Sequence, residues 1–355
     1  MESNMFLWNE LQTASRPILI YGMGNGAEKV LELCQKYGIR PAGLFASDSH
    51  ARTGVFQGFP VMARSEALQK YPNALILLAF GTERPEEITE LLALSRDDRL
   101  RIPDVPLLGG ESLTPDNVAT REDEIRRCRG LFSDAASRAL FDSLLEAKLT
   151  GQPEAVMANT SPRTELLDLL NLGPQEDYLD LGAYRGDTME EFLSLTGGNY
   201  RTMTAMEPDA HNYRKLQEAF GGFPCTTLYP YASWNVSTSL EFTGKGGRNC
   251  AKKPELPGKY THLHPVEALP VDALSLEVSY AKMDVEGAEA ETLQGMAQTI
   301  SRCRPKLLIS AYHRPDDFIT LPLLAAQLLP DADFYLRRTP CIPTWEIQLC
   351  VLPRK

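Results

Sequence analysis

The residues best suited to chemistry are the acidic and glycine residues of one segment in the second half, Tyr178-Leu-Asp-Leu-Gly-Ala-Tyr-Arg-Gly-Asp187. An apolar run ends at Asp180, turns through Gly182 and Gly186, and leads into a helical pattern from Asp187. Ligands of open α/β sheets bind beyond the carboxyl ends of the strands, where a glycine lets the backbone approach the ligand closely. The Gly-x-x-x-Gly spacing differs from the Gly-x-Gly-x-x-Gly of diphosphate sites. Because Asp180 and Asp187 would repel a diphosphate, the turn predicts a cationic ligand such as S-adenosylmethionine, which carries a sulfonium.

A second acidic residue, Glu207, stands at the end of the next predicted strand, 27 residues after Asp180. A carboxylate at that place can accept hydrogen bonds from both hydroxyls of a ribose. The alternative is that Asp180 caps the following turn and that Glu207 is a solvated strand end. Two chemically matched features at this interval favour a nucleoside-binding pocket.

Ionisable residues follow two further strands. Lys282, Asp284 and Glu286 alternate at the end of an apolar strand, and His313 ends another, so we expect them on the same rim, facing the methyl donor. Methyl transfer is an in-line displacement that mainly requires an oriented acceptor. For a hydroxyl acceptor, Asp284 or His313 would help to remove the proton, and Lys282 completes the predicted catalytic set. The alternative for His313 is a structural histidine. Asp284 and Glu286 could also bind a hard cation, but we assign no metal ligand from the sequence.

Three sequence blocks, Asp-x-Gly-x-x-x-Gly-Asp, Glu-Pro-Asp and Lys-x-Asp-Val-Glu-Gly-x-Glu, occur in this order between Tyr178 and Leu352. With Pro230-Tyr-Ala-Ser-Trp and Arg304-Pro-Lys-Leu-Leu-Ile-Ser, this part of the chain resembles the FkbM family of methyltransferases. The resemblance implies a class I seven-stranded methyltransferase fold, S-adenosylmethionine as cofactor, and O-methylation, often of hydroxyls of sugars and secondary metabolites.

The same resemblance implies roles for individual residues. The methionine side would be lined by Asp180, Gly182, Tyr184, Gly186 and Asp187, the ribose would be bound by Glu207, and the adenine edge would lie against Ala232 and Ser233. The glycine- and lysine-rich stretch Thr243–His264 departs from the family pattern, so acceptor specificity is not transferred across it. It is either a solvated loop or a segment that closes over the site, and His262 and His264 within it are not assigned as metal ligands.

The elements that must position these residues alternate between strands and helices, which indicates α/β folding with parallel sheets. The 355 residues exceed the length of about 250–300 at which one core stops growing, which favours two domains. We predict a Rossmann-like N-terminal domain (1–120), a helical segment and linker (121–163) and a class I methyltransferase domain (164–355). Strands are expected in the first part at 17–22, 41–46, 74–80 and 105–108. Strands are expected in the last part at 177–182, 203–206, 226–231, 279–285 and 306–311, followed by a hairpin of 333–336 and 345–352.

The first part carries a fingerprint of its own, Gly22-x-Gly24-x-x-Ala27, between a strand and a helix, with Asp48 after the second strand. That context is typical of dinucleotide sites, so the alternative function is an NAD- or nucleotide-sugar-binding enzyme. The segment also resembles small nucleotide-binding-like domains attached to sugar-modifying transferases, including its Gly-Phe-Pro-Val run at 58–61. The competing interpretation is a degenerate module used for docking or acceptor recognition.

Composition limits the partners. A formal charge of −11 argues against a general affinity for nucleic acid, which requires an excess of Lys and Arg. No apolar run approaches the ~20 residues that span a bilayer, and residues 1–13 lack the basic start of a secretory signal. Seven cysteines without a CxxC pair favour a reduced, cytoplasmic protein. We expect a small-molecule or sugar hydroxyl acceptor; the oligomeric state stays open, homo-oligomers included.

Overall fold

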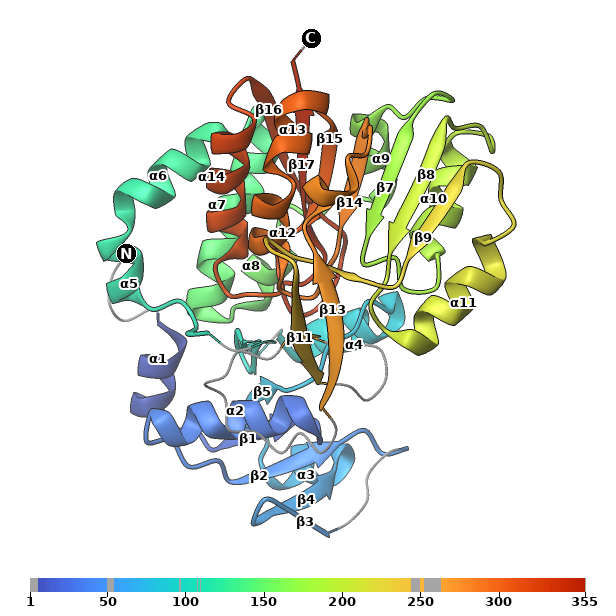
Figure 1. The fold of residues 1–355 in the computed structure, drawn as a ribbon. Helices are drawn as coiled ribbons and strands as arrows, with labels where there is room; N and C mark the ends of the chain where they lie inside the picture. Colours follow the sequence, from blue (N-terminus) through green and yellow to red (C-terminus); the bar gives the residue numbers. More distant parts are fainter. Residues whose placement is uncertain are drawn as a thin grey trace.

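A computed structural model describes residues 6–49, 54–95, 97–106, 108, 110–243, 250–251 and 263–354. Most of the glycine- and lysine-rich stretch, including His262, lies outside the described residues. Each half of the chain contains its own sheet, the N-terminal sheet in the lower part of Figure 1 and a larger one above it. The α/β architecture with a mostly parallel N-terminal sheet and a C-terminal methyltransferase-type sheet, as predicted, is confirmed.

The N-terminal sheet has the strand order β3-β4-β2-β1-β5-β6. Its strands are β1 (Ile18–Tyr21), β2 (Gly43–Ala46), β3 (Gly54–Phe56), β4 (Phe59–Ala63), β5 (Leu75–Leu78) and β6 (Leu100–Arg101). Neighbouring strands run parallel except β3 and β4, which form a hairpin. The helices of this half are α1 (Leu7–Thr13), α2 (Asn25–Lys36), α3 (Arg64–Lys70) and α4 (Pro85–Ser95).

One predicted strand of this half was wrong. The described residues of the segment 105–108 form no strand, and the sheet instead ends in β6. Strand β6 could not be recognised from an apolar run, because one of its two residues is the charged Arg101. Arg101 is 2% exposed, and its guanidinium forms two hydrogen bonds with the carboxylate of Glu10, which compensates for its burial.

Four helices connect the two sheets, and together they contact both halves of the chain. They are α5 (Pro115–Thr120), α6 (Glu122–Leu131), α7 (Ala135–Thr150) and α8 (Pro153–Met157). In α7, the hydroxyl of Ser137 accepts hydrogen bonds from the backbone N–H of Leu336 and from Arg337, both in the strand Ala332–Arg338 of the C-terminal sheet. At the other end of α7, Lys148 pairs with Asp104 of the N-terminal half at 2.8 Å. The division of the chain at residues 120 and 163 stays a prediction.

The C-terminal sheet has the strand order β16-β17-β15-β14-β7-β8-β9, with β17 antiparallel to its neighbours. Its strands are β7 (Asp177–Leu181), β8 (Thr202–Met206), β9 (Thr226–Tyr229), β14 (Tyr280–Met283), β15 (Lys306–Ser310), β16 (Ala332–Arg338) and β17 (Ile347–Pro353). This is the predicted seven-stranded arrangement with its C-terminal hairpin. The chain order reverses between β7 and β14, which is the position where open α/β sheets bind ligands.

Helices cover both faces of this sheet (Figure 1). They are α9 (Arg163–Leu170), α10 (Asp187–Leu195), α11 (Ala210–Phe220), α12 (Glu289–Gly295), α13 (Ala297–Cys303) and α14 (Asp317–Leu328), with a 3₁₀ turn at Val271–Leu274. Alternate strand residues face opposite layers: Tyr178 stacks on Phe192 of α10, whereas Leu179 belongs to the core that includes α12 to α14. The helix predicted at 288–302 is divided into α12 and α13.

A small four-stranded sheet, β10-β13-β11-β12, was not predicted. It consists of β10 (Ala232–Ser233), β11 (Thr238–Thr243), β12 (Cys250–Ala251) and β13 (Leu263–Leu269). In the part of the chain that the structure describes, no helix has the length and apolar character needed to cross a membrane.

Candidate active site

The glycine turn after β7 forms as predicted, but its first glycine is needed for a different reason. The backbone N–H groups of Gly182 and Ala183 both donate to the carbonyl of Met206, at 3.0 and 3.1 Å. Gly182 has φ +80°, and a Cβ there would lie 1.9 Å from the carbonyl oxygen of Asp284. The absence of a side chain thus lets the turn approach the end of β14 closely. This contact fixes Asp284 relative to the turn.

Of the other predicted residues of the turn, Gly186 is buried, whereas Tyr184 and Asp187 are accessible. A Cβ on Gly186 would lie 2.1 Å from the ring of Phe220 in α11, so this glycine is required by helix packing. Tyr184 is 38% exposed, and Asp187, the first residue of α10, is also exposed. Tyr184 and Asp187 are therefore free to contact a ligand beyond the turn.

Asp180 and Lys282 lie beneath the turn and hold it. Asp180 is fully buried, and its Oδ2 accepts hydrogen bonds from the hydroxyls of Tyr178 at 2.9 Å and Thr188 at 2.5 Å. The ammonium of Lys282 lies 3.3 Å from Asp180 Oδ1 and donates to the carbonyl of Gly182 at 3.0 Å. Burial disfavours the charged Lys282, but the carboxylates of Asp180 and Asp284 outweigh it and raise its pKa. These contacts favour a positioning role for both residues.

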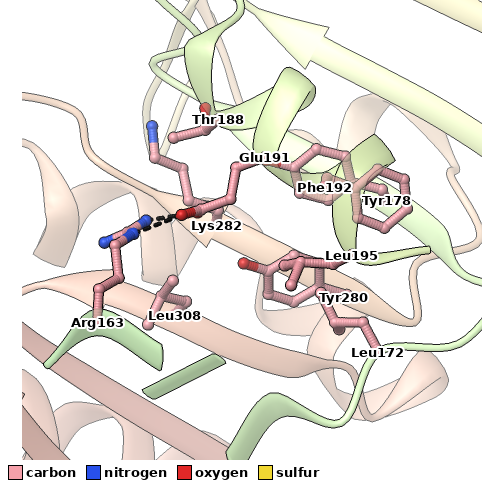
Figure 2. Close-up of a pocket in the computed structure, with 10 residues that line it drawn as sticks. All are labelled: Arg163, Leu172, Tyr178, Thr188, Glu191, Phe192, Leu195, Tyr280, Lys282 and Leu308. Carbon is pink, nitrogen blue, oxygen red and sulfur yellow. Dashed lines mark hydrogen bonds and ion pairs between the residues drawn. The ribbon is translucent and has the colours of Figure 1, made fainter. Parts of the chain in front are cut away.

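A small pocket adjoins this cluster on the α9–α10 side of the sheet (Figure 2). Thr188 and Lys282 line it, and Arg163 forms a two-point ion pair with Glu191 beside it. Of the predicted ribose and catalytic residues, Lys282 lines this pocket, whereas Glu207, Asp284 and His313 do not. We therefore do not assign it to the cofactor.

Glu207, the first residue after β8, is oriented by two backbone groups. Its Oε2 accepts from the N–H of Tyr184 and its Oε1 from the N–H of Asp209, both at 2.8 Å. The residue is 6% exposed. Burial raises the pKa of this carboxyl to about 7, against the two backbone hydrogen bonds, which lower it. The glycine turn and the ribose candidate are thus joined by one hydrogen bond.

Ala232 and Ser233 form β10 in the small sheet. Both are buried, and β10 pairs in parallel with β13. The Ser233 hydroxyl lies 2.9 Å from the hydroxyl of Thr292 in α12. This contact fixes the Ser233 side chain against α12, and the hydroxyl oxygen keeps acceptor capacity for a further hydrogen bond.

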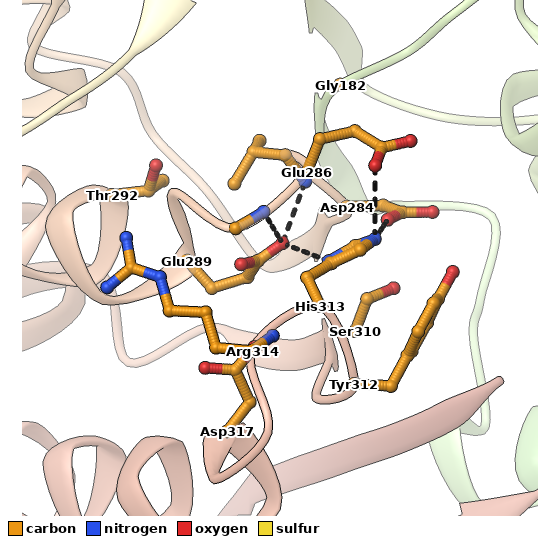
Figure 3. Close-up of polar contacts among 12 residues, drawn as sticks. Gly182, Asp284, Glu286, Glu289, Thr292, Ser310, Tyr312, His313, Arg314 and Asp317 are labelled. Atoms are coloured by element: carbon orange, nitrogen blue, oxygen red, sulfur yellow. Dashed lines mark hydrogen bonds and ion pairs between the residues drawn. The ribbon is translucent and has the colours of Figure 1, made fainter. Parts of the chain in front are cut away.

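His313 lies among three carboxylates at the ends of β14 and β15 (Figure 3). Its Nδ1 lies 2.8 Å from Glu289 Oε1, and its Nε2 lies 3.4 Å from Asp284 Oδ1 and 3.6 Å from Glu286 Oε2. The His313 side chain is 3% exposed, whereas those of Asp284 and Glu286 are about one-third exposed. Burial disfavours the imidazolium, but the charges of Glu289, Asp284 and Glu286 outweigh it and raise the pKa of His313 to about 10.

Two members of this cluster were not identified from the sequence. Glu289 is buried; its Oε1 also accepts from the backbone N–H groups of Val285 and Gly287, while its Oε2 has no hydrogen-bond partner among the described residues. Asp317 is buried at the start of α14, and burial, with the charge of Glu289, raises its pKa to about 7. Each is an acidic residue in the first turn of a helix, a pattern that also suits an ordinary helix start.

The strand order β8-β7-β14-β15 places two groups of polar residues along one rim. Glu207 lies beyond β8, the glycine turn follows β7, and Asp284 and His313 follow β14 and β15. A nucleoside bound at Glu207 would thus have its remaining part over the turn, next to the exposed carboxylates. The predicted residues that follow β7, β8, β14 and β15 thus lie along one rim, and Ser233 contacts Thr292 of α12, the helix that begins at Glu289.

The N-terminal fingerprint folds into the expected strand–turn–helix. A Cβ on Gly26 would lie 2.0 Å from the carbonyl oxygen of Ala79, so α2 packs closely on the chain after β5. Asp48 Oδ1 accepts hydrogen bonds from the N–H and hydroxyl of Ser65. One oxygen of the carboxylate that the dinucleotide alternative requires is therefore engaged at the start of α3.

A family model and two solved structures are similar to parts of this chain. Residues 180–338 match the methyltransferase FkbM domain. Over 95% of this chain and 90% of the other, the structure is similar to methyltransferase FkbM from Methylobacillus flagellatus KT, with a TM-score of 0.70 and 18% identity. An rRNA methylase from Streptococcus thermophilus matches 55% of this chain and 98% of its own, with a TM-score of 0.37 and 13% identity. No curated protein sequence matches the chain significantly.

Proposed function

We propose, from the premise that the C-terminal half of the chain is a methyltransferase domain of the FkbM family, that the protein transfers the methyl group of S-adenosylmethionine to a hydroxyl. The acceptor class is a sugar, a glycan or a small metabolite. The observation that carries the proposal is the orientation of Glu207 by two backbone N–H groups, one of which belongs to the glycine turn.

The residues of the rim fit this cofactor. Glu207 retains lone pairs for the two ribose hydroxyls, because each of its oxygens accepts one backbone hydrogen bond. Asp187 and Tyr184 lie exposed at the turn, where an amino acid moiety would extend. Asp187, Glu207 and Asp284 place negative charge around the path of a ligand with a sulfonium and an ammonium group.

When bound, S-adenosylmethionine supplies an electrophilic methyl carbon on a positively charged sulfur. The chain then has to orient the acceptor oxygen and take its proton. Asp284 and Glu286 are the exposed proton acceptors, whereas His313 is buried with Nδ1 directed at Glu289. Transfer would form a C–O bond at the acceptor oxygen and leave the electrons of the C–S bond on sulfur, and Asp284 or Glu286 would take the acceptor proton.

The setting of the reaction is part of the proposal. We place it in the cytoplasm, since five of the described cysteines, Cys34, Cys128, Cys225, Cys303 and Cys350, carry free thiols. The formal charge of −11 favours a small acceptor over nucleic acid. Neither Lys282 nor Asp180 is expected to contact the acceptor, because both are buried under the turn.

The test is calorimetric titration with S-adenosylhomocysteine. We expect one site in the native protein, with affinity reduced at least tenfold in Glu207→Gln and unchanged in Glu218→Gln, a matched exposed glutamate that pairs with Lys215. No heat of binding at millimolar ligand would refute the cofactor. The acceptor class is tested by transfer of labelled methyl to a panel of sugars and hydroxylated metabolites; products that are amines or base-labile esters would contradict O-methylation.

A further inference from the structure

The nitrogen Nε2 of His313 faces two carboxylates, which raises the question of which positive charge lies between them. Glu289 Oε1 already accepts two backbone N–H groups, so Nδ1 of His313 donates its proton to this oxygen. In the neutral ring, Nε2 then presents a lone pair to Asp284 Oδ1 and Glu286 Oε2. A lone pair facing two carboxylates is repulsive. A positive charge, either a second proton or a cation, must lie between them.

The distances favour a cation. A charge-assisted hydrogen bond from Nε2 would bring one carboxylate to about 2.7–2.9 Å. The observed 3.4 and 3.6 Å are nearly equal and longer than that. Ligands bound at about 2.0–2.2 Å to one ion are separated by roughly 3.0–3.5 Å in octahedral or tetrahedral geometry. Each carboxylate oxygen therefore lies from Nε2 at about the separation of two ligands of one ion.

The surroundings of His313 match those of a metal-binding histidine. Such histidines donate their second ring N–H to a carboxylate, which fixes the ring and increases its basicity. Glu289 takes this part: it is 1% exposed, and its Oε2 has no hydrogen-bond partner in the described structure. Ligand atoms of Asp284, Glu289 and His313 all lie within 4.8 Å of one another. Even if His313 were an imidazolium, the cluster of His313 with the ionised carboxylates of Asp284, Glu286 and Glu289 would have a net charge of −2.

We propose that His313 Nε2, Asp284 and Glu286 bind one divalent cation, with Glu289 as the outer carboxylate that orients the histidine. One nitrogen and two carboxylates favour a first-row ion such as Mn²⁺ over Ca²⁺, which takes six to eight oxygen ligands. The open coordination positions face the rim, since the Asp284 and Glu286 side chains are one-third exposed. This role rests on the proposed function: the cation holds the acceptor oxygen next to the methyl donor.

The experiment is titration of the metal-free full-length protein with Mn²⁺, followed by calorimetry and electron paramagnetic resonance. We expect one site that binds Mn²⁺ at least tenfold more tightly than Ca²⁺. Affinity should fall at least tenfold in Asp284→Asn and in Glu286→Gln, and stay unchanged in Glu277→Gln, which removes an exposed carboxylate that pairs with Arg302. Nitrogen modulation of the electron spin echo should be present and should disappear in His313→Gln.

Absence of Mn²⁺ binding at millimolar concentration would overturn the proposal and leave a proton at Nε2. Unchanged affinity in either carboxylate variant, or an echo without nitrogen modulation in the native protein, would also overturn it. Because Asp284 and Glu286 are partly exposed, their variants can be tested even if the buried His313→Gln fails to fold. Binding of S-adenosylhomocysteine, measured in the same samples, separates the two proposals, since either ligand can fail without the other.

Discussion

Replacing Glu207 by glutamine should change how the stability of the protein depends on pH. Burial raises the pKa of this carboxyl from its ordinary value of 4.5 to about 7 in the folded state. Between these values the folded protein holds a proton that the unfolded chain has lost. Glu207 therefore contributes stability below pH 4.5, and this contribution is lost as the pH rises through about 7.

The size of the effect follows from the same two values. The difference corresponds to about 3 kcal/mol of unfolding free energy, lost by the native protein between pH 4.5 and 7.5. Glutamine does not titrate, so the variant lacks this loss. Its carbonyl can accept only one of the two backbone N–H groups that bind Glu207, which costs about 1–3 kcal/mol at every pH. The variant should thus be less stable than the native protein at pH 5 and comparable to it at pH 8.

Urea unfolding of both proteins at a series of pH values measures this difference. All other titrating groups cancel in the comparison, and Glu218→Gln, at an exposed position, should give a curve parallel to that of the native protein. Cofactor binding provides a second readout. If ribose hydroxyls donate to the ionised Glu207, affinity for S-adenosylhomocysteine should fall by up to about tenfold per pH unit below 7, and Glu207→Gln should remove this dependence. Parallel stability curves for Glu207→Gln and the native protein would refute the reasoning.

Two further substitutions test the packing around the site. Gly182→Ala places a Cβ against the carbonyl of Asp284 in a left-handed backbone, so we expect a loss of about 2–5 kcal/mol in urea unfolding. Gly173→Ala, where no other atom lies within 4 Å, should change stability by less than about 1 kcal/mol, and equal losses would contradict this explanation. Asp104→Ala leaves the buried ammonium of Lys148 unpaired and should cost about 3–5 kcal/mol; adding Lys148→Met should recover most of it, and no recovery would rule out the buried charge as the cause.

The parts of the fold that could be predicted are those whose signal is local. Buried parallel strands are continuous apolar runs, so the strands around the glycine turn were recognised, and Glu207 followed from its place at a strand end. The small sheet was missed because β11, Thr-Ser-Leu-Glu-Phe-Thr, mixes polar and apolar residues and resembles a loop. Strand β6 was missed because Arg101 is compensated by Glu10, a partner 91 residues away.

The site shows the same limit. Spacing along the chain suggested that Asp284 and His313 share a rim, because both end apolar strands. It could not indicate that Glu289 would reach back to His313, since this contact depends on the turn between β14 and α12. Nor could it distinguish a glycine required by a ligand from one required by the backbone of Asp284. Such contacts are set by the packing of separate elements and leave no periodic pattern in the sequence.

The N-terminal half contributes to the rim itself. A Cβ on Gly287, in the turn that follows Asp284, would lie 2.7 Å from Leu108, and one on Gly81 would lie 2.1 Å from the ring of Trp345. Thr82 and Ile342 exchange two backbone hydrogen bonds at 2.7 and 2.9 Å, so the chain after β5 is bridged to the β16–β17 link. The loops after β14 and before β17 are thus held by N-terminal residues. The geometry around Asp284 and His313 therefore depends on both halves of the chain.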